Sequence, residues 1–130
     1  MIFLDTSAIY AWTDRADPQH EVAKARLKTI LEDTETLVTH NYVLVEATAL
    51  IQRRLGLTVA RAFALDAAAF DIEWVDAALH GEALERWKRG RRELSLVDEV
   101  SFLVMRRRGI RAAFAFDPDF EREGFQVYEG

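Results

Sequence analysis

Three aspartates stand directly after apolar segments that are predicted to be strands. Asp5 closes the segment Ile2–Asp5, and Asp117 and Asp119 follow Ala112–Phe116. In parallel α/β sheets ligands bind beyond the carboxyl ends of the strands, so carboxylates there can take part in chemistry. Each aspartate also has a local alternative, because Asp5 can cap a following helix and an Asp-Pro-Asp turn can cap itself. The turn is the preferred interpretation for Asp119 alone, and a functional role is preferred for Asp117.

A fourth acid, Glu46, falls within the predicted helix Asn41–Leu55. A step of about 100° per residue places Glu46 inside the apolar stripe formed by Val43, Ala47 and Leu50. An inward-facing carboxylate is costly unless it is paired or bound to a metal. We therefore predict that Glu46 faces inward. The alternative is a helix rolled so that Glu46 lies at the edge of the stripe.

A fifth acid, Asp98, lies in the first turn of the predicted helix Ser95–Arg108. The segment beginning at Ser95 resembles a capping box with Asp98 as its acid, which is a structural alternative. Phe102 and Met105 follow on the same face, and apolar residues cover the other sides, so this helix is predicted to be central and buried. Capping and metal binding are compatible, because a carboxylate has two oxygens.

These acids are predicted to converge at one edge of a sheet, where they would repel one another strongly without cations. Hard oxygen ligands suit Mg²⁺ or Mn²⁺. The absence of cysteine excludes a thiol nucleophile, cysteine-ligated zinc and disulfides. His20, His40 and His80 occur singly, without the spacing of metal ligands or a catalytic triad, and are interpreted as structural or exposed.

The elements that must position the acids alternate between short apolar runs and longer helical ones, as in a parallel α/β sheet. One domain is predicted over residues 1–130. Besides the two strands and two helices above, strands are predicted at Leu37–Thr39, Ile72–Val75 and Phe125–Tyr128. Helices are predicted at Thr6–Trp12, His20–Asp33, Leu57–Phe70 and Asp76–Lys88, and Gly109 is expected to end the last helix.

The composition, with half of the residues hydrophobic, fits a globular protein without a signal peptide or membrane span, for which a cytoplasmic location is the default. The net charge of −5 argues against nucleic-acid binding. The basic residues are uneven, however, and form either solvated helix ends or a rim that faces phosphate. Nine of the 17 lie between Arg86 and Arg111, namely Arg86, Lys88, Arg89, Arg91, Arg92, Arg106, Arg107, Arg108 and Arg111.

Four segments in order resemble the PIN-domain ribonucleases, most closely the VapC-type toxins of toxin–antitoxin pairs. They are Ile2-Phe3-Leu4-Asp5-Thr6-Ser7-Ala8, the helical Val43-Leu44-Val45-Glu46-Ala47, the stretch from Ser95 to Met105 around Asp98, and Phe114-Ala115-Phe116-Asp117-Pro118-Asp119-Phe120 with Gly124-Phe125. The likeness spans essentially the whole chain. It implies a three-layer α/β/α sandwich with a short parallel sheet and a Mg²⁺- or Mn²⁺-dependent RNA phosphodiester hydrolase.

By position, the resemblance implies that Asp5, Glu46, Asp98 and Asp117 bind the metal. It implies that Ser7 is a hydroxyl that holds a ligand or a water. Two departures matter. Val97 stands where these toxins often carry a threonine. Asp119 adds a further candidate ligand, so either it or Asp117 faces the metal, and we favour Asp117.

The resemblance also implies a VapB-type antitoxin as partner and a homodimer. Leu57–Phe70 is apolar enough for a partner groove, with ordinary core as the alternative, and Trp12 and Trp87 are candidate anchors. Three other functions stay open: a PIN nuclease of RNA processing without an antitoxin, a non-catalytic interaction module, and a receiver-like signalling domain. The last is disfavoured because Asp5 precedes Thr6-Ser7 and no lysine follows Lys88.

Overall fold

The strands of the computed structural model, which describes residues 1–130, form one parallel sheet. It has five strands in the order β3-β2-β1-β4-β5. In the centre, Phe3 lies opposite Val38 on one side and Ala113 on the other. The strands are β1 Ile2–Leu4, β2 Leu37–His40, β3 Asp71–Glu73, β4 Ala112–Phe114 and β5 Gln126–Val127.

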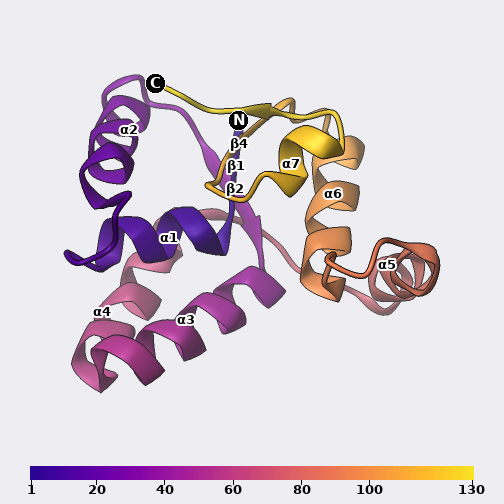
Figure 1. Cartoon of the computed structure of the whole chain (residues 1–130), viewed down its shortest axis with the longest axis horizontal. Helices are drawn as coiled ribbons and strands as arrows, with labels where there is room; N and C mark the ends of the chain where they lie inside the picture. The colour runs from indigo at the N-terminus through magenta and orange to yellow at the C-terminus, as the bar shows by residue number, and fades with distance from the viewer.

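Seven α-helices cover the sheet, with α1 to α4 on one side of the central strands and α5 and α6 on the other (Figure 1). The predicted α/β/α sandwich with a parallel sheet is confirmed. None of the helices combines the length and apolar character needed to cross a lipid bilayer. The helices are α1 Thr6–Thr13, α2 His20–Glu32, α3 Asn41–Leu55, α4 Leu57–Asp66, α5 Ala77–Arg89, α6 Leu96–Arg108 and α7 Asp119–Arg122, with a 3₁₀ turn at Ala67–Ala69.

The strand order reverses between β1 and β4. The chain builds outward from β1 through β2 to β3, and then α5 and α6 carry it back to place β4 on the other side of β1. In open α/β sheets such a reversal leaves a crevice beyond the carboxyl ends of the two central strands. Asp5 follows β1 directly, and the segment that contains Asp117 follows β4, so the topology alone brings these two acids to the same crevice.

The core packs on both faces of the central strands. Phe3, Leu4 and Phe114 are fully buried, which explains why these strands are continuously apolar rather than alternating. Helix α6 is buried at every position from Glu99 to Met105, which confirms that it is a central helix. Gly109 ends it in the left-handed conformation, with φ of 66°, as expected of a residue at this position.

The structure departs from the predicted elements mainly after β4. The strand ends at Phe114 rather than Phe116, because the amide of Phe116 donates to the Ser7 hydroxyl instead of a neighbouring strand. The four-residue α7 was not predicted, since so short a helix shows no periodicity. The predicted helix Leu57–Phe70 stops at Asp66 and continues as a 3₁₀ turn.

Candidate metal centre

Asp5 lies at the end of β1 and is the N-cap of α1, with 5% of its surface exposed. Its Oδ2 accepts hydrogen bonds from the Ser7 amide at 3.1 Å and from the Ser7 hydroxyl at 2.6 Å. The same hydroxyl oxygen accepts from the Phe116 amide at 2.9 Å. Ser7 therefore fixes the Asp5 carboxylate and ties it to the chain that leaves β4.

Burial raises the pKa of Asp5 to about 6. The two hydrogen bonds from Ser7 oppose this shift, and the negative charges of Asp98 and Asp117 add to it. A carboxylate of this kind is held in an environment that disfavours its charge. The Asp5 side chain has no basic partner within 4.0 Å, so the surroundings leave its charge uncompensated.

Asp98 is brought to the site by the N-terminus of α6. Its Oδ2 accepts from the Ser95 amide at 2.9 Å and its own amide donates to the Ser95 hydroxyl at 3.1 Å, which completes the predicted capping box. Its pKa is raised, first by burial and then by the charges of Asp119 and Glu46, against the effect of the Ser95 bonds. The cap uses one carboxylate oxygen, so the other remains available.

Asp117 and Asp119 follow β4 in a tight turn. The Oδ1 of Asp117 accepts from the Asp119 amide at 2.9 Å. The pKa of Asp117 is raised by partial burial and by the nearby charges of Asp119 and Asp98. Ligand atoms of Asp98, Asp117 and Asp119 lie within 4.8 Å of one another. Such a cluster of carboxylate oxygens, two of them on residues of raised pKa, suits a divalent ion that prefers oxygen.

Glu46 is the site residue whose surroundings were wrongly predicted. The buried stripe of α3 is Val43, Ala47 and Ile51, and Glu46 is exposed. The helix is rolled so that Glu46 lies beside the stripe, which was the alternative interpretation. Its charge nevertheless contributes to the raised pKa of Asp98, so Glu46 stands near the acids without being one of the close three.

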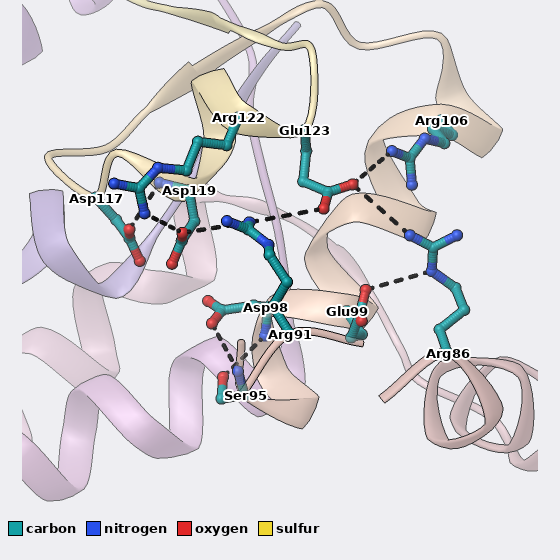
Figure 2. Close-up of polar contacts among 10 residues, drawn as sticks. All are labelled: Arg86, Arg91, Ser95, Asp98, Glu99, Arg106, Asp117, Asp119, Arg122 and Glu123. Carbon is teal, nitrogen blue, oxygen red and sulfur yellow. Dashed lines mark hydrogen bonds and ion pairs between the residues drawn. The ribbon is translucent and has the colours of Figure 1, made fainter. Parts of the chain in front are cut away.

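Asp119 differs from its neighbours because it is paired with arginines. Its side chain is 9% exposed, and its Oδ1 lies 3.1 Å from Arg122 Nη1 and 3.5 Å from Arg91 Nη2 (Figure 2). The Asx-type turn preferred for this residue is present, because the Asp119 amide donates to Asp117 Oδ1, but the ion pairs of the Asp119 side chain were not predicted. The pairing with Arg91 links positions 28 residues apart, which no local pattern reveals.

The basic run is mostly an ion-pair network, rather than free cations. Arg86 meets the buried Glu99 at 3.3 Å and Glu123 at 3.8 Å, and Arg106 reaches Glu123 at 2.9 Å (Figure 2). Arg89, Arg92 and Arg111 have no carboxylate within 4.0 Å and are exposed. The other pairs are Arg107 with Glu82, Arg108 with Asp71 and Glu73, and Lys88 with Glu85.

His40 connects the two helices that carry Glu46 and Asp98. It caps α3 by accepting from the Val43 amide at its Nδ1, and its Nε2 lies 2.9 Å from the Ser101 hydroxyl of α6. Since that hydroxyl donates to the Val97 carbonyl, Nε2 carries the proton. Burial lowers the pKa of His40 to about 3. As predicted, the histidines are structural, and the other two bond to protein groups, His20 to Ala11 and His80 to Tyr42.

Comparison with known proteins identifies the family. The sequence model of the PIN-domain family matches residues 2–125 of this chain. The chain belongs to the PIN-domain family. The predicted resemblance to PIN-domain ribonucleases of the VapC type is thereby confirmed. The chain is 39% identical over 129 residues to the "23S rRNA-specific endonuclease VapC20" of two strains of Mycobacterium tuberculosis, CDC 1551 / Oshkosh and H37Rv, covering 96% of this chain and 95% of that protein.

A solved structure agrees with this assignment. The crystal structure of Mycobacterium tuberculosis VapC20, described as a sarcin–ricin loop cleaving toxin, superimposes with a TM-score of 0.88 at 36% sequence identity. The match covers 100% of both chains. This PIN domain and VapC20 therefore share the complete fold, including the order of elements that brings the acids to one crevice.

Proposed function

We propose that this PIN domain is a Mg²⁺- or Mn²⁺-dependent ribonuclease that hydrolyses RNA phosphodiester bonds, and that it is the toxin of a VapBC-type pair. The observation that carries the proposal is the convergence of Asp5, Asp98 and Asp117 where the strand order reverses. None of these three has an ion pair with an arginine or lysine. In a homologue of an RNA endonuclease, such uncompensated carboxylates support a metal site.

Each acid has a distinct part in this proposal. Asp98 and Asp117 would hold the ion directly, and Asp5, oriented by Ser7, would contribute from the end of β1. Glu46 would reach the site from the exposed edge of α3, where RNA has access. When bound, the ion would supply a water of lowered pKa and would stabilise charge on the attacking and leaving oxygens. No side-chain nucleophile is needed.

The Ser7 hydroxyl supports this arrangement by fixing two segments at once. It donates to Asp5 and accepts from the Phe116 amide, so it holds the end of β1 against the segment that leads to Asp117. Loss of the hydroxyl would leave a buried carboxylate with one donor fewer. We therefore assign Ser7 as a positioning residue for Asp5.

For the substrate we propose ribosomal RNA, on the strength of the relative's name and the full-length similarity. An rRNA substrate requires a cytoplasmic location, which we propose with it. The test compares wild type with Asp5→Asn on 23S rRNA and on an unrelated RNA mixture, each with Mg²⁺ and with EDTA. We expect cleavage only by wild type with Mg²⁺, and a loss of at least about 100-fold in Asp5→Asn. Equal cleavage by both proteins, or cleavage in EDTA, would contradict the proposal.

The partners belong to the same proposal. A groove of 350 Å³ between α1, α2 and α4 is lined by apolar side chains that include Trp12, Leu31 and Phe63. Leu31 and Leu65 are more than half exposed. These surfaces support a bound VapB-type antitoxin, and Trp87, which is 46% exposed, supports a further contact such as a homodimer. Co-expression with an antitoxin-like neighbour, followed by gel filtration, distinguishes this from a PIN nuclease without an antitoxin.

A further inference from the structure

Among the acids of the crevice, Asp119 stands apart because its charge is already compensated. One oxygen, Oδ1, lies 3.1 Å from Arg122 Nη1 and 3.5 Å from Arg91 Nη2. Asp98 and Asp117, whose ligand atoms lie within 4.8 Å of an Asp119 oxygen, have no such partner. A divalent ion bound by Asp119 would either displace two guanidinium groups or sit beside them against their repulsion.

The two arginines are held at the carboxylate but remain open to solvent. The side chains of Arg91 and Arg122 are 43% and 56% exposed. Each uses one terminal nitrogen for Asp119, and a guanidinium group has five N–H donors, so most of the donors are free. Figure 2 shows both guanidinium groups directed toward Asp119, with that of Arg122 next to Asp117 and that of Arg91 between Asp119 and Glu123.

Arg91 also lies near a second carboxylate. Its Nη2 lies 4.0 Å from Glu123 Oε1, and Glu123 is itself bound by Arg106 at 2.9 Å and by Arg86 at 3.8 Å. Arg91 thus sits between two carboxylates, at the boundary between the acid cluster and the ion-pair network. Fixing a long side chain in this way lowers the conformational entropy that it loses when it binds a ligand.

We propose that Asp119 is a positioning residue rather than a metal ligand, and that it holds Arg91 and Arg122 beside the metal-binding carboxylates to bind the phosphates of the RNA strand that flank the cleaved bond. This inference rests on the proposed ribonuclease function. A planar guanidinium matches the oxygens of a phosphate with two parallel hydrogen bonds. The arginines supply positive charge that a protein of net charge −5 otherwise lacks at an acidic site.

The competing interpretation is that the arginines compensate the charge of Asp119 only while no metal ion is bound. In that case Asp119 would release them and become a ligand once an ion arrives. Metal affinity separates the two, because only a ligand contributes to it directly. The measurement is Mn²⁺ binding by isothermal titration calorimetry, without RNA, for wild type, Asp119→Asn and Asp117→Asn.

We expect Asp119→Asn to bind Mn²⁺ within about threefold of wild type, whereas Asp117→Asn loses tenfold or more, a change of at least about 1.4 kcal/mol. Equal losses in both variants would overturn the inference and make Asp119 a ligand. A wild-type protein that binds no Mn²⁺ would overturn the proposed function and this inference together. The two failures are therefore distinguishable.

The second measurement concerns the arginines. Binding of a fluorescein-labelled oligouridylate is followed in EDTA, which prevents cleavage, at increasing salt for wild type and Arg91→Gln. Each lost phosphate contact with single-stranded RNA lowers the slope of log affinity against log salt by about 0.7. We expect that loss in Arg91→Gln and in Asp119→Asn. Because Arg91 is exposed, we expect Arg91→Gln to fold, so the phosphate-binding role can be tested even if Asp119→Asn does not fold.

The matched control is Arg107→Gln, which removes an equally charged, ion-paired side chain from the far end of α6. Its position nine residues after Asp98 corresponds to about 14 Å along the helix axis. We expect the control to keep the salt slope of wild type. A slope in Arg91→Gln equal to that of the control would overturn the phosphate-binding role.

Discussion

Asp98 and Glu99 are neighbours on α6, yet they belong to different regions of the molecule. Asp98 faces the acid cluster, has no basic partner and has a raised pKa. Glu99 faces away, has a side chain only 3% exposed and is paired with Arg86 at 3.3 Å. A rotation of about 100° per residue is enough to separate them. The comparison indicates that a compensated acid holds the fold together, whereas an uncompensated acid is ready to bind a cation.

The strongest test of this comparison removes the negative charge of each neighbour in turn. Asp98→Asn retains a capping oxygen but removes a proposed ligand, so we expect RNA cleavage to fall at least about 100-fold. Glu99→Gln leaves the Arg86 guanidinium without its buried partner, so we expect a loss of about 1–3 kcal/mol in the free energy of unfolding. Urea denaturation and an RNA cleavage assay measure the two effects. Loss of stability in Asp98→Asn, with cleavage retained, would contradict the division.

The next test uses the pH dependence of stability without metal. The folded pKa of Asp5, about 6, lies above the ordinary value of 3.8 for an aspartate, so this residue's contribution to stability is fully present below about pH 4 and is lost as pH rises through about 6. The difference between these two pKa values corresponds to about 3 kcal/mol in the free energy of unfolding. We expect Asp5→Asn to be the more stable protein above pH 6, in EDTA, by chemical denaturation.

His40 changes stability in the opposite direction and serves as the internal reference. Its folded pKa, about 3, lies below the ordinary value of 6.5 for a histidine, so its contribution to stability is lost as pH falls from about 6.5 toward 3. This loss occurs in wild type and in Asp5→Asn alike. The difference between the two proteins therefore isolates Asp5, and a difference that does not vary with pH would contradict its assigned environment.

Metal binding should stabilise only the uncompensated region. At a free Mn²⁺ concentration about one hundred times the Kd, we expect wild type to gain about 2.7 kcal/mol in the free energy of unfolding. The gain follows because the ion neutralises carboxylates that repel one another in the metal-free protein. Thermal unfolding with and without Mn²⁺ measures it. Asp117→Asn should show a much smaller gain, and an undiminished gain there would place the ion elsewhere.

The smallest expected effect concerns the compensated region. A Cβ at Gly90 would lie 2.8 Å from Glu99 Oε2 and 3.1 Å from the Arg86 carbonyl oxygen. Gly90→Ala should therefore push Glu99 away from Arg86 and cost about 1 kcal/mol of stability. Mn²⁺ affinity, measured by calorimetry, should remain that of wild type. A weaker Mn²⁺ affinity would show that the two regions are coupled.

Some features were predictable because their causes are local. The bounds of Asn41–Leu55, the capping box of Ser95 with Asp98 and the role of Gly109 follow from neighbours within a few positions. The place of Asp5 at the end of β1 was predictable for the same reason. The alternation of strands with helices then limits the possible topologies. The sequence could therefore predict that two acids at strand ends would meet.

The sequence by itself determined which elements carry Asp5, Glu46 and Asp98 and that the sheet is parallel, because periodicity and capping depend on adjacent residues. Only the tertiary structure decided that Glu46 lies beside the buried stripe and that Asp119 is bound by Arg91, 28 residues earlier in the chain. The physical reason is that helix rotation and ion pairing depend on side chains distant in the chain. Where an apolar stripe is compatible with two rotations of a helix, packing decides which rotation is adopted. Where several acids lie within reach of an arginine, packing decides which of them it pairs with.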